Sequence, residues 1–534
     1  MTQDIHKLSL KEKIGQLFVF GFQGYEPAPE ILDLIERYGV GGVIYFTRNI
    51  VDAKQVHELS QSLNDAGRKA GRVPMFIAID QEGGMVARLV KGITLTPGNM
   101  ALGATGDADA AGDTARISGE QLRAVGVNLN FAPVVDVNNN PDNPVINVRS
   151  YGDNAELVSE FGLAAVRGYQ SAGVSATVKH FPGHGDTNVD SHHALAMLAH
   201  DRARLEEIEL VPFRRTAEDA DFVMTAHVGL PALDPSGVPS TLSKPILTGL
   251  LREDIGYQGI IITDCLEMDA IDKNYGPGKG SVMALQAGAD MVLVSHTPAK
   301  HREALAAVEA AVASGELSEE RIDASVKRIL AAKAKRGLYE PLKPWAEIEA
   351  SLDTPEQRQV VEKWSEASVT LVKNEGGLLP LRKEAKTLVL WPEIVAVSVA
   401  DEMLSEDGTL GARLAHRLAD VVERKVTDPS ALEGLEQFEQ IVFVSYDAAK
   451  FAAERAMAAK LAELAPDRTV AVSVRNPLDL LLYPDVKAFL AVYECRPLAL
   501  EAAAKALTGE LAPVGRLPLR ISEQYPLGWR WQQA

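Results

Sequence analysis

Short hydrophobic runs alternate with amphipathic helical segments through the first 340 residues of the chain. The runs are rich in β-branched and aromatic residues, which is typical of buried strands. Strands that alternate with helices in this way indicate βαβ units around a parallel sheet. Eight runs have this character: Gln16–Phe22, Val40–Phe46, Met75–Asp80, Asn128–Val134, Ser175–His180, Phe222–His227, Gly259–Asp264 and Met291–Ser295.

Eight strands separated by helices predict a (β/α)8 TIM barrel over residues 1–340. The intervening helices are expected at Pro29–Tyr38, Ala53–Ala70, Asp113–Val125, Ala155–Ala172, Leu205–Asp219, Pro245–Asp254, Lys279–Ala287 and His301–Ser314. In a barrel of this kind, chemistry is built at the C-terminal ends of the strands. The ends of the eight runs are therefore where functional side chains are expected.

The pattern changes after a further helix predicted at Glu319–Arg336, which ends at Gly337. Residues 341–366 contain several prolines and no clear period, which indicates a linker. Residues 367–534 alternate again and predict a smaller layered α/β sandwich domain, with helices at Phe451–Leu464 and Ala499–Leu507. Its strands are expected at Val369–Lys373, Thr387–Trp391, Gln440–Val444, Thr469–Val474 and Lys487–Val492. Because this region holds no cluster of catalytic residue types, we expect it to pack against the barrel and stabilise it.

The stretch KHFPGHGDTNVDSHH, residues 179–193, holds four of the eleven histidines and follows directly on the predicted fifth strand. Pro182, Gly183 and Gly185 break regular structure, so the stretch is predicted to be a loop. Asp190 stands two residues before His192. In a locally extended backbone the two side chains point the same way, so this carboxylate can orient that imidazole.

Ionisable residues also stand at the ends of other apolar runs. Asp80 ends the third run, Lys179 and His180 end the fifth, His227 ends the sixth and Asp264 ends the seventh. Such groups are costly to bury without partners. Taken singly, Asp264 could cap a helix and Arg88, a few residues after the third run, could form a surface ion pair; together they predict a site at one rim of the barrel.

Composition and charge narrow the function. The 534 residues are 46% hydrophobic and 24% charged, and the formal net charge is −19, which excludes the basic surface that nucleic acids and anionic membranes require. A neutral small molecule is the expected partner. Only Cys265 and Cys495 are present, so no disulfide framework is expected. No signal peptide or membrane span is evident, which predicts a cytoplasmic enzyme.

Four segments together resemble glycoside hydrolase family 3. They are AIDQEGGMVAR (78–88), NFAPVVDVNNNPDNPVINVRSYG (130–152), KHFPGHGDTNVDSHH (179–193) and IITDCLEMDAI (261–271). The Asp-Ser-His triplet at 190–192 resembles the one found in the β-N-acetylhexosaminidase branch of the family, and β-glucosidases of the family lack it. The segments LVKNEGGLLPL and LAPVGRLPLRI extend the resemblance into the C-terminal region.

The resemblance implies a retaining hydrolase that removes terminal non-reducing β-linked N-acetylglucosamine from cell-wall fragments or chitooligosaccharides. It implies that Asp264 is the nucleophile, that His192 is the general acid/base and that Asp190 orients His192. The implied sugar-binding residues are Asp80, Arg88, Arg149, Lys179 and His180. No metal and no cofactor are implied. Cys265 departs from the small or acidic residue expected after the nucleophile.

The chemistry independently favours these residue types. A retaining glycosidase needs a carboxylate below the anomeric carbon and an acid beside the leaving oxygen. A neighbouring carboxylate favours the protonated form of a histidine and so makes it a better acid.

Three alternatives remain open from the sequence. A phosphorylase could use the same site with phosphate as acceptor, because a histidine repels phosphate less than a carboxylate does. A metal-dependent barrel hydrolase would recruit the side chains of His180, His184, His192, His193, Asp186 and Asp264. A non-catalytic sugar-binding protein is disfavoured while Asp264 and His192 are both present.

Overall fold

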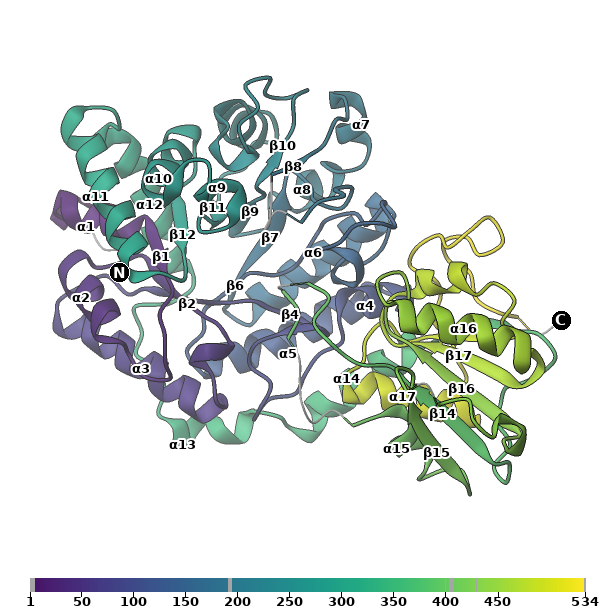
Figure 1. Ribbon diagram of the computed structural model, residues 1–534. Coiled ribbons are helices and arrows are strands. Elements are labelled where there is room, and N and C mark those ends of the chain that lie inside the picture. Colours follow the sequence, from purple (N-terminus) through teal and green to yellow (C-terminus); the bar gives the residue numbers. More distant parts are fainter. Residues whose placement is uncertain (1–4, 191–194, 399, 403–407, 429, 533–534) are drawn as a thin grey trace.

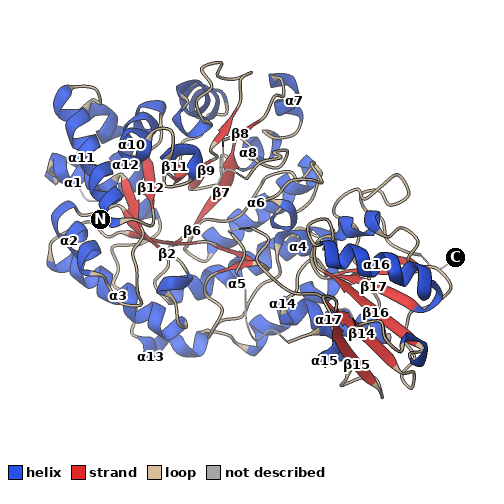
Figure 2. Ribbon diagram, viewed as in Figure 1, coloured by secondary structure: helices blue, strands red, loops and turns tan. Residues whose placement is uncertain are grey.

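The computed structural model describes residues 5–190, 195–398, 400–402, 408–428 and 430–532. Within them, eight parallel strands close into a barrel in the order β1-β12-β11-β9-β7-β6-β3-β2, with helices outside (Figures 1 and 2). The predicted TIM barrel is thus confirmed. Its strands are β1 (Phe18–Phe20), β2 (Gly42–Tyr45), β3 (Phe76–Ile79), β6 (Leu129–Asn130), β7 (Ser175–Phe181), β9 (Phe222–Thr225), β11 (Ile260–Cys265) and β12 (Met291–Val294).

Helices around the barrel form where the sequence supplies amphipathic segments with caps. Asp52, Asn154 and Ser318 each accept a hydrogen bond from a backbone N–H in the first turn of the helix that follows. The barrel-region helices are α1 (Leu10–Gln16), α2 (Pro29–Tyr38), α3 (Ala53–Lys69), α4 (Asn99–Thr105), α5 (Asp109–Ala124), α6 (Ala155–Ser171), α9 (Asp269–Asp272), α10 (Gly276–Ala287), α11 (Pro298–Ser314) and α12 (Glu319–Lys335).

One predicted helix, Leu205–Asp219, is wrong in its continuity. The structure has two short helices instead, α7 (Arg202–Glu207) and α8 (Val211–Thr216). Pro212 lies in the first turn of α8, where its missing N–H costs nothing, whereas inside one long helix it would remove a hydrogen bond. The predicted helix Pro245–Asp254 has the predicted bounds but forms i→i+5 hydrogen bonds as η5.

The C-terminal domain is a six-stranded sheet in the order β13-β18-β17-β16-β14-β15, parallel except for β13. Figure 1 shows α16 (Ala452–Leu464) lying along this sheet. The edge strand β15 (Val421–Lys425) is missing from the prediction, because its half-exposed side chains give it no apolar pattern. The other strands are β13 (Thr370–Asn374), β14 (Thr387–Trp391), β16 (Gln440–Ser445), β17 (Thr469–Ser473) and β18 (Ala488–Ala491).

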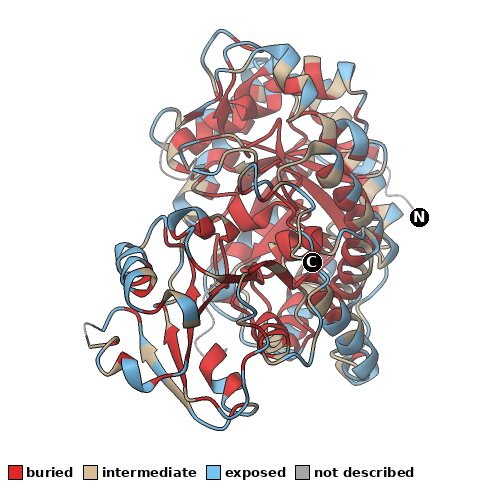
Figure 3. Cartoon of the chain, turned by 90° about the vertical axis from the view of Figure 1, so that its right-hand side faces the viewer, coloured by how far each residue is buried: buried red, intermediate tan, exposed pale blue. Residues whose placement is uncertain are grey.

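Two large hydrophobic clusters occupy the two domains, and the buried residues follow the barrel strands and the second sheet (Figure 3). The stretch predicted as a linker contains α13 (Trp345–Ile348) and the first twelve residues of α14 (Pro355–Ser368). Met85, Met100 and Val148 of the barrel region pack into the C-terminal cluster. The two domains therefore share an apolar interface, to which the barrel region contributes residues from the segments after β3 and β6.

In the described part of the chain, no helix combines the length and the apolarity needed to cross a bilayer.

Candidate active site

A cavity of about 380 Å³ opens at the C-terminal ends of the barrel strands. Six of the predicted site residues line it: Asp80, Arg88, Arg149, Lys179, His180 and Asp264. Asp80 directly follows β3, and Arg88 directly follows the hairpin strand β5 (Val86–Ala87). Arg149 lies in the segment after β6, Lys179 and His180 lie in β7, and Asp264 lies in β11. Residues 80 and 264 are almost 200 positions apart, so closure of the barrel is what brings them to one rim.

The predicted acid/base pair is only partly described. Asp190 is half-buried on the loop after β7, and its charge acts to raise the pKa of His184, against the larger effect of burial. His192 lies outside the described residues. His184 itself is a poor acid at neutral pH, because burial lowers its pKa to about 4.

A buried charge cluster occupies one side of the cavity. Lys179 Nζ lies 2.7 Å from Asp80 Oδ1 and 2.7 Å from Glu82 Oε1. Arg149 binds Glu82 through both carboxylate oxygens, with Nη2–Oε1 and Nε–Oε2 distances of 2.8 and 3.0 Å. Burial would raise the pKa of Glu82, but Arg149 and Lys179 hold that pKa well below its usual range. The cluster presents fixed donors and acceptors suited to sugar hydroxyls.

A second carboxylate, Asp136, supports His180 near the end of β7 and His184 in the loop that follows. Its Oδ2 lies 2.7 Å from His180 Nδ1, and its Oδ1 accepts a 2.7 Å hydrogen bond from the His184 backbone N–H. The Asp136 side chain is fully buried. Burial opposes its charge, yet His180 and His184 keep its pKa below the ordinary value.

Asp264 stands at the end of β11 and is half-buried at the cavity wall. One of its oxygens accepts a 2.7 Å hydrogen bond from the Cys265 backbone N–H. The adjacent Cys265 thiol lies 2.9 Å from Ser295 Oγ, and burial raises the pKa of this thiol to about 12. The thiol is thus held protonated, and Asp264 is the group in this pair that can act as a nucleophile.

His227 is at the end of β9 but does not belong to the cavity lining. Its Nε2 lies 2.9 Å from the Cys265 carbonyl and its Nδ1 lies 2.8 Å from Thr241 Oγ1. It is fully buried. We interpret it as a support that ties β9 to the end of β11.

The C-terminal domain reaches the cavity, which differs from the expectation that it only stabilises the barrel. Ala400 and Glu402 line the cavity. Arg88 Nη1 donates to the Ala400 carbonyl at 2.9 Å and to Glu402 Oε1 at 3.0 Å. The sequence gives no signal for this contact, because more than 300 positions separate its partners.

Glu82, Asp136 and His184 are also missing from the predicted site. Glu82 and Asp136 lie inside the family-like segments 78–88 and 130–152, so they could have been found as carboxylates close to the predicted cations. His184 lies in the histidine-rich loop and is buried, as His180 is, and the sequence pattern does not single it out.

The described residues do not gather the predicted metal ligands. Asp186, His200 and Glu209 are the described side chains close enough to share an ion, and of these only Asp186 belongs to the metal alternative. Arg204 lies 2.7 Å from Glu209 and 3.5 Å from Asp186. Its guanidinium already supplies the positive charge there, so we interpret the group as an ion-pair network.

Residues 9–332 match the family model described as "Glycosyl hydrolase family 3 N terminal domain". Over 386 residues the chain is 39% identical to "Beta-hexosaminidase A" of Pseudoalteromonas piscicida, a match covering 68% of this chain and 64% of that protein. The chain thus matches slightly less than two thirds of that relative's length.

Two solved structures show the same architecture along almost the whole chain. A glycoside hydrolase family 3 β-N-acetylglucosaminidase from Paenibacillus sp. str. FPU-7 superposes with a TM-score of 0.92 at 48% identity, covering 96% of this chain and 99% of that one. A β-glucoside phosphorylase superposes with a TM-score of 0.84 at 25% identity, covering 97% and 95%. The chain therefore belongs to glycosyl hydrolase family 3, the family that its sequence segments predict.

Proposed function

We propose that this chain is a retaining glycosidase that removes terminal β-linked N-acetylglucosamine from cell-wall fragments, chitooligosaccharides or related glycans. One observation carries the proposal: the Asp264 carboxylate opens onto the same cavity as the Asp80–Lys179–Glu82–Arg149 cluster. A nucleophile beside a set of hydroxyl-binding groups is what retaining hydrolysis requires. The likeness to a β-hexosaminidase and a β-N-acetylglucosaminidase supports the choice of sugar.

The proposed reaction has two steps. Asp264 attacks the anomeric carbon, the glycosidic C–O bond breaks, and the leaving oxygen takes a proton from His192. His192, now neutral, then removes a proton from water, whose oxygen attacks the anomeric carbon and releases Asp264. Asp190 orients His192 and favours its protonated form. Each cycle returns every group to its starting state.

The remaining predicted residues hold the sugar. Asp80 accepts hydrogen bonds from hydroxyls, while Lys179, Arg149 and Arg88 donate. Glu82 holds the side chains of Lys179 and Arg149 in place, because it forms an ion pair with each of them. Preorganised donors of this kind lower the cost of binding.

The test is turnover of an aryl β-N-acetylglucosaminide and an aryl β-glucoside, each with and without inorganic phosphate and with a chelator. We expect preference for the N-acetylglucosaminide, free sugar as the product and no loss with chelator. Preference for the glucoside would overturn the branch, and loss with chelator would favour a metal enzyme.

Phosphorolysis is the second candidate, because the chain is similar over 97% of its length to a β-glucoside phosphorylase. In that reaction phosphate oxygen replaces water in the second step, and the product is a sugar 1-phosphate. Detection of N-acetylglucosamine 1-phosphate as the main product in phosphate buffer would establish this candidate over hydrolysis.

A cytoplasmic location belongs to the same proposal. Cys265 and Cys495 are both free and buried, which suits a reducing compartment. Such a location fits an enzyme that recycles small cell-wall fragments. Retention of activity in the cytoplasmic fraction of the source cells is the measurement that checks it.

A further inference from the structure

One wall of the cavity comes from outside the barrel. Glu402 lies in the loop that follows β14 of the C-terminal domain, and its carboxylate faces two groups of the barrel. Oε1 accepts from Arg88 Nη1 at 3.0 Å, and Oε2 accepts from the Thr47 hydroxyl at 2.5 Å. Thr47 belongs to the segment directly after β2. Glu402 therefore joins the β2 and β3 sides of the barrel mouth.

The backbone beside Glu402 is held by buried charges of the C-terminal domain. Asp401 forms an ion pair with Arg475 at 3.1 Å, and both side chains are almost fully buried. Asp401 also accepts hydrogen bonds from the backbone N–H groups of Val397 and Ser398. These contacts fix the loop immediately before Glu402.

Arg496 fixes the other side of the same contact. Its Nη2 donates to the Glu402 carbonyl at 2.8 Å, and its Nε donates to the Gly84 carbonyl at 2.8 Å. Gly84 lies in the turn between β4 (Gln81–Gly83) and β5, the hairpin that leads to Arg88. The Arg496 guanidinium thus links the backbone of Glu402 to the hairpin through hydrogen bonds to both.

Arg88 retains capacity for a ligand. Its side chain is only 8% exposed, and its buried Nε has no hydrogen-bond partner among the described residues. Buried donors are rarely left unsatisfied in a finished site. The Glu402 side chain keeps 20% of its surface exposed, so the carboxylate also remains accessible.

The charge of the cavity depends on Glu402. Among the described residues, and with histidines taken as neutral, the lining carries four cations, Arg48, Arg88, Arg149 and Lys179, and four carboxylates, Asp80, Glu82, Asp264 and Glu402. Without Glu402 the balance shifts to one net positive charge. A buried arginine without its carboxylate is a ready site for sulfate or phosphate groups.

We propose that Glu402 is a specificity-determining residue of the sugar site, supplied by the C-terminal domain. It holds Arg88 in the orientation that binds sugar, and its charge makes the cavity select neutral sugars over sugars or ions that carry an anionic group. This inference rests on the proposed glycosidase function for its substrate, but the anion preference of Arg88 can be measured without turnover.

The experiment compares the parent with Glu402→Gln, which keeps the shape and removes the charge. We expect KM for an aryl β-N-acetylglucosaminide to rise about tenfold with kcat changed less than about threefold, because binding is weakened uniformly. Inorganic sulfate should inhibit the variant competitively at a concentration at least tenfold lower than it inhibits the parent. Thr47→Val should raise KM in the same direction, since it releases the other carboxylate oxygen.

Glu393→Gln is the matched control, because it removes the same charge from an exposed position on the same loop. If Glu402→Gln keeps KM and sulfate inhibition within twofold of this control, Glu402 only joins the two domains and the inference is wrong. If the parent turns over no N-acetylglucosaminide, the proposed function fails instead. Sulfate binding by calorimetry then still tests the role of Glu402, since tighter binding to the variant supports it and equal binding overturns it.

Discussion

Asp136 Oδ2 lies 2.7 Å from His180 Nδ1 in a fully buried contact. The pKa of Asp136 is below its ordinary value, because the neighbouring histidines favour its charged form against the cost of burial. A charged carboxylate can only accept, so the Nδ1 of His180 must carry the hydrogen. The contact therefore assigns the tautomer of His180, which is one of the residues that line the cavity.

Asp136→Asn tests this relationship. We expect the free energy of unfolding at pH 7 to fall by about 2 kcal/mol, because hydrogen bonds to a charged group are lost in a buried site. The lowered pKa of Asp136 means that its contribution is present above the ordinary pKa near 4 and is lost as pH falls further. Urea unfolding at pH 7 and below pH 4 should therefore show a difference that shrinks in acid. Asp142→Asn, an exposed carboxylate nearby, should change neither value.

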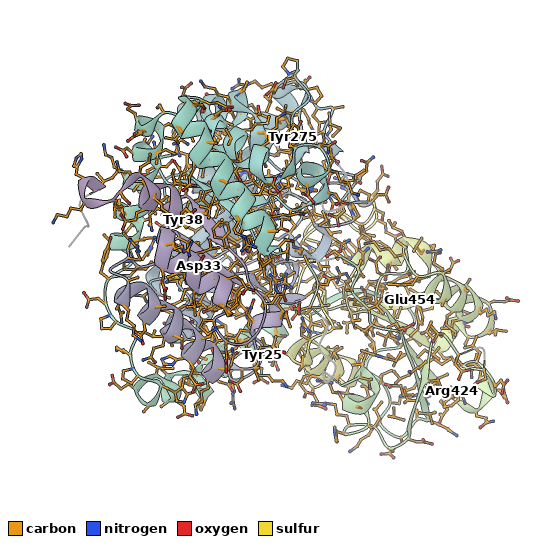
Figure 4. The ribbon with its side chains drawn as sticks, turned by 60° about the vertical axis from the view of Figure 1, so that its left-hand side comes forward. Tyr25, Asp33, Tyr38, Tyr275, Arg424 and Glu454 are labelled. Carbon is orange, nitrogen blue, oxygen red and sulfur yellow. The ribbon has the colours of Figure 1, made fainter. Side chains whose placement is uncertain are left out.

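Glu454 of α16 provides a second test, in the C-terminal domain (Figure 4). Burial raises the pKa of Glu454 to about 7, and the nearby Asp447 carboxylate adds to this shift. The folded state therefore keeps a proton that the unfolded state releases near pH 4.5. Stability should fall by up to about 3 kcal/mol as pH rises from 4.5 to 7.

The measurement is unfolding by urea across that pH window. Glu454→Gln should flatten the dependence, because the amide has no proton to lose and can still accept from the Tyr446 backbone N–H, as Oε2 does at 2.8 Å. Glu463→Gln, on an exposed position of the same helix, is the control and should keep the parent's slope. An unchanged slope in Glu454→Gln would place the titrating group elsewhere.

Asp264→Ala should abolish turnover while the fold stays intact. The substitution removes the proposed nucleophile at a half-buried position, so no large cavity is opened. Loss of the covalent route should lower kcat at least about a thousandfold, equivalent to roughly 4 kcal/mol of barrier. Circular dichroism and melting temperature check the fold. Activity within about tenfold of the parent would show that Asp264 is not the nucleophile; Asp269→Ala is the control, since Asp269 lies near in sequence and pairs with Lys273.

The barrel could be predicted from the sequence because its strands are short apolar runs that are almost completely buried. Phe76–Ile79 is followed directly by Asp80, and Ile260–Cys265 contains the half-buried Asp264; both carboxylates also marked the site. The edge strand Val421–Lys425 could not be found, since half-exposed residues carry no strong alternation. Pro212 was the signal for the break between α7 and α8, and the sequence prediction passed over it.

The part of the cavity wall that comes from the C-terminal domain was harder to predict than the part at the strand ends of the barrel. Asp80 and Lys179 end apolar runs, and that position alone makes them candidates. Glu402 follows no such rule, because it reaches the cavity only through the packing of the second domain. Contacts between distant segments are set by tertiary structure, so no local sequence pattern predicts them.

The last prediction concerns the pair Asp190 and His192. His192→Ala should slow substrates with poor leaving groups far more than aryl substrates with activated leaving groups, because an activated phenolate departs with little protonation. Asp190→Ala should act in the same direction but less strongly, since the imidazole stays and only its orienting partner is lost. The alkaline limb of the pH–rate profile reports loss of the acid's proton; without the Asp190 charge, protonated His192 is less favoured and this limb should move to lower pH. Equal rate losses for good and poor leaving groups, with an unmoved limb, would show that another residue is the acid and that His192 only positions its loop.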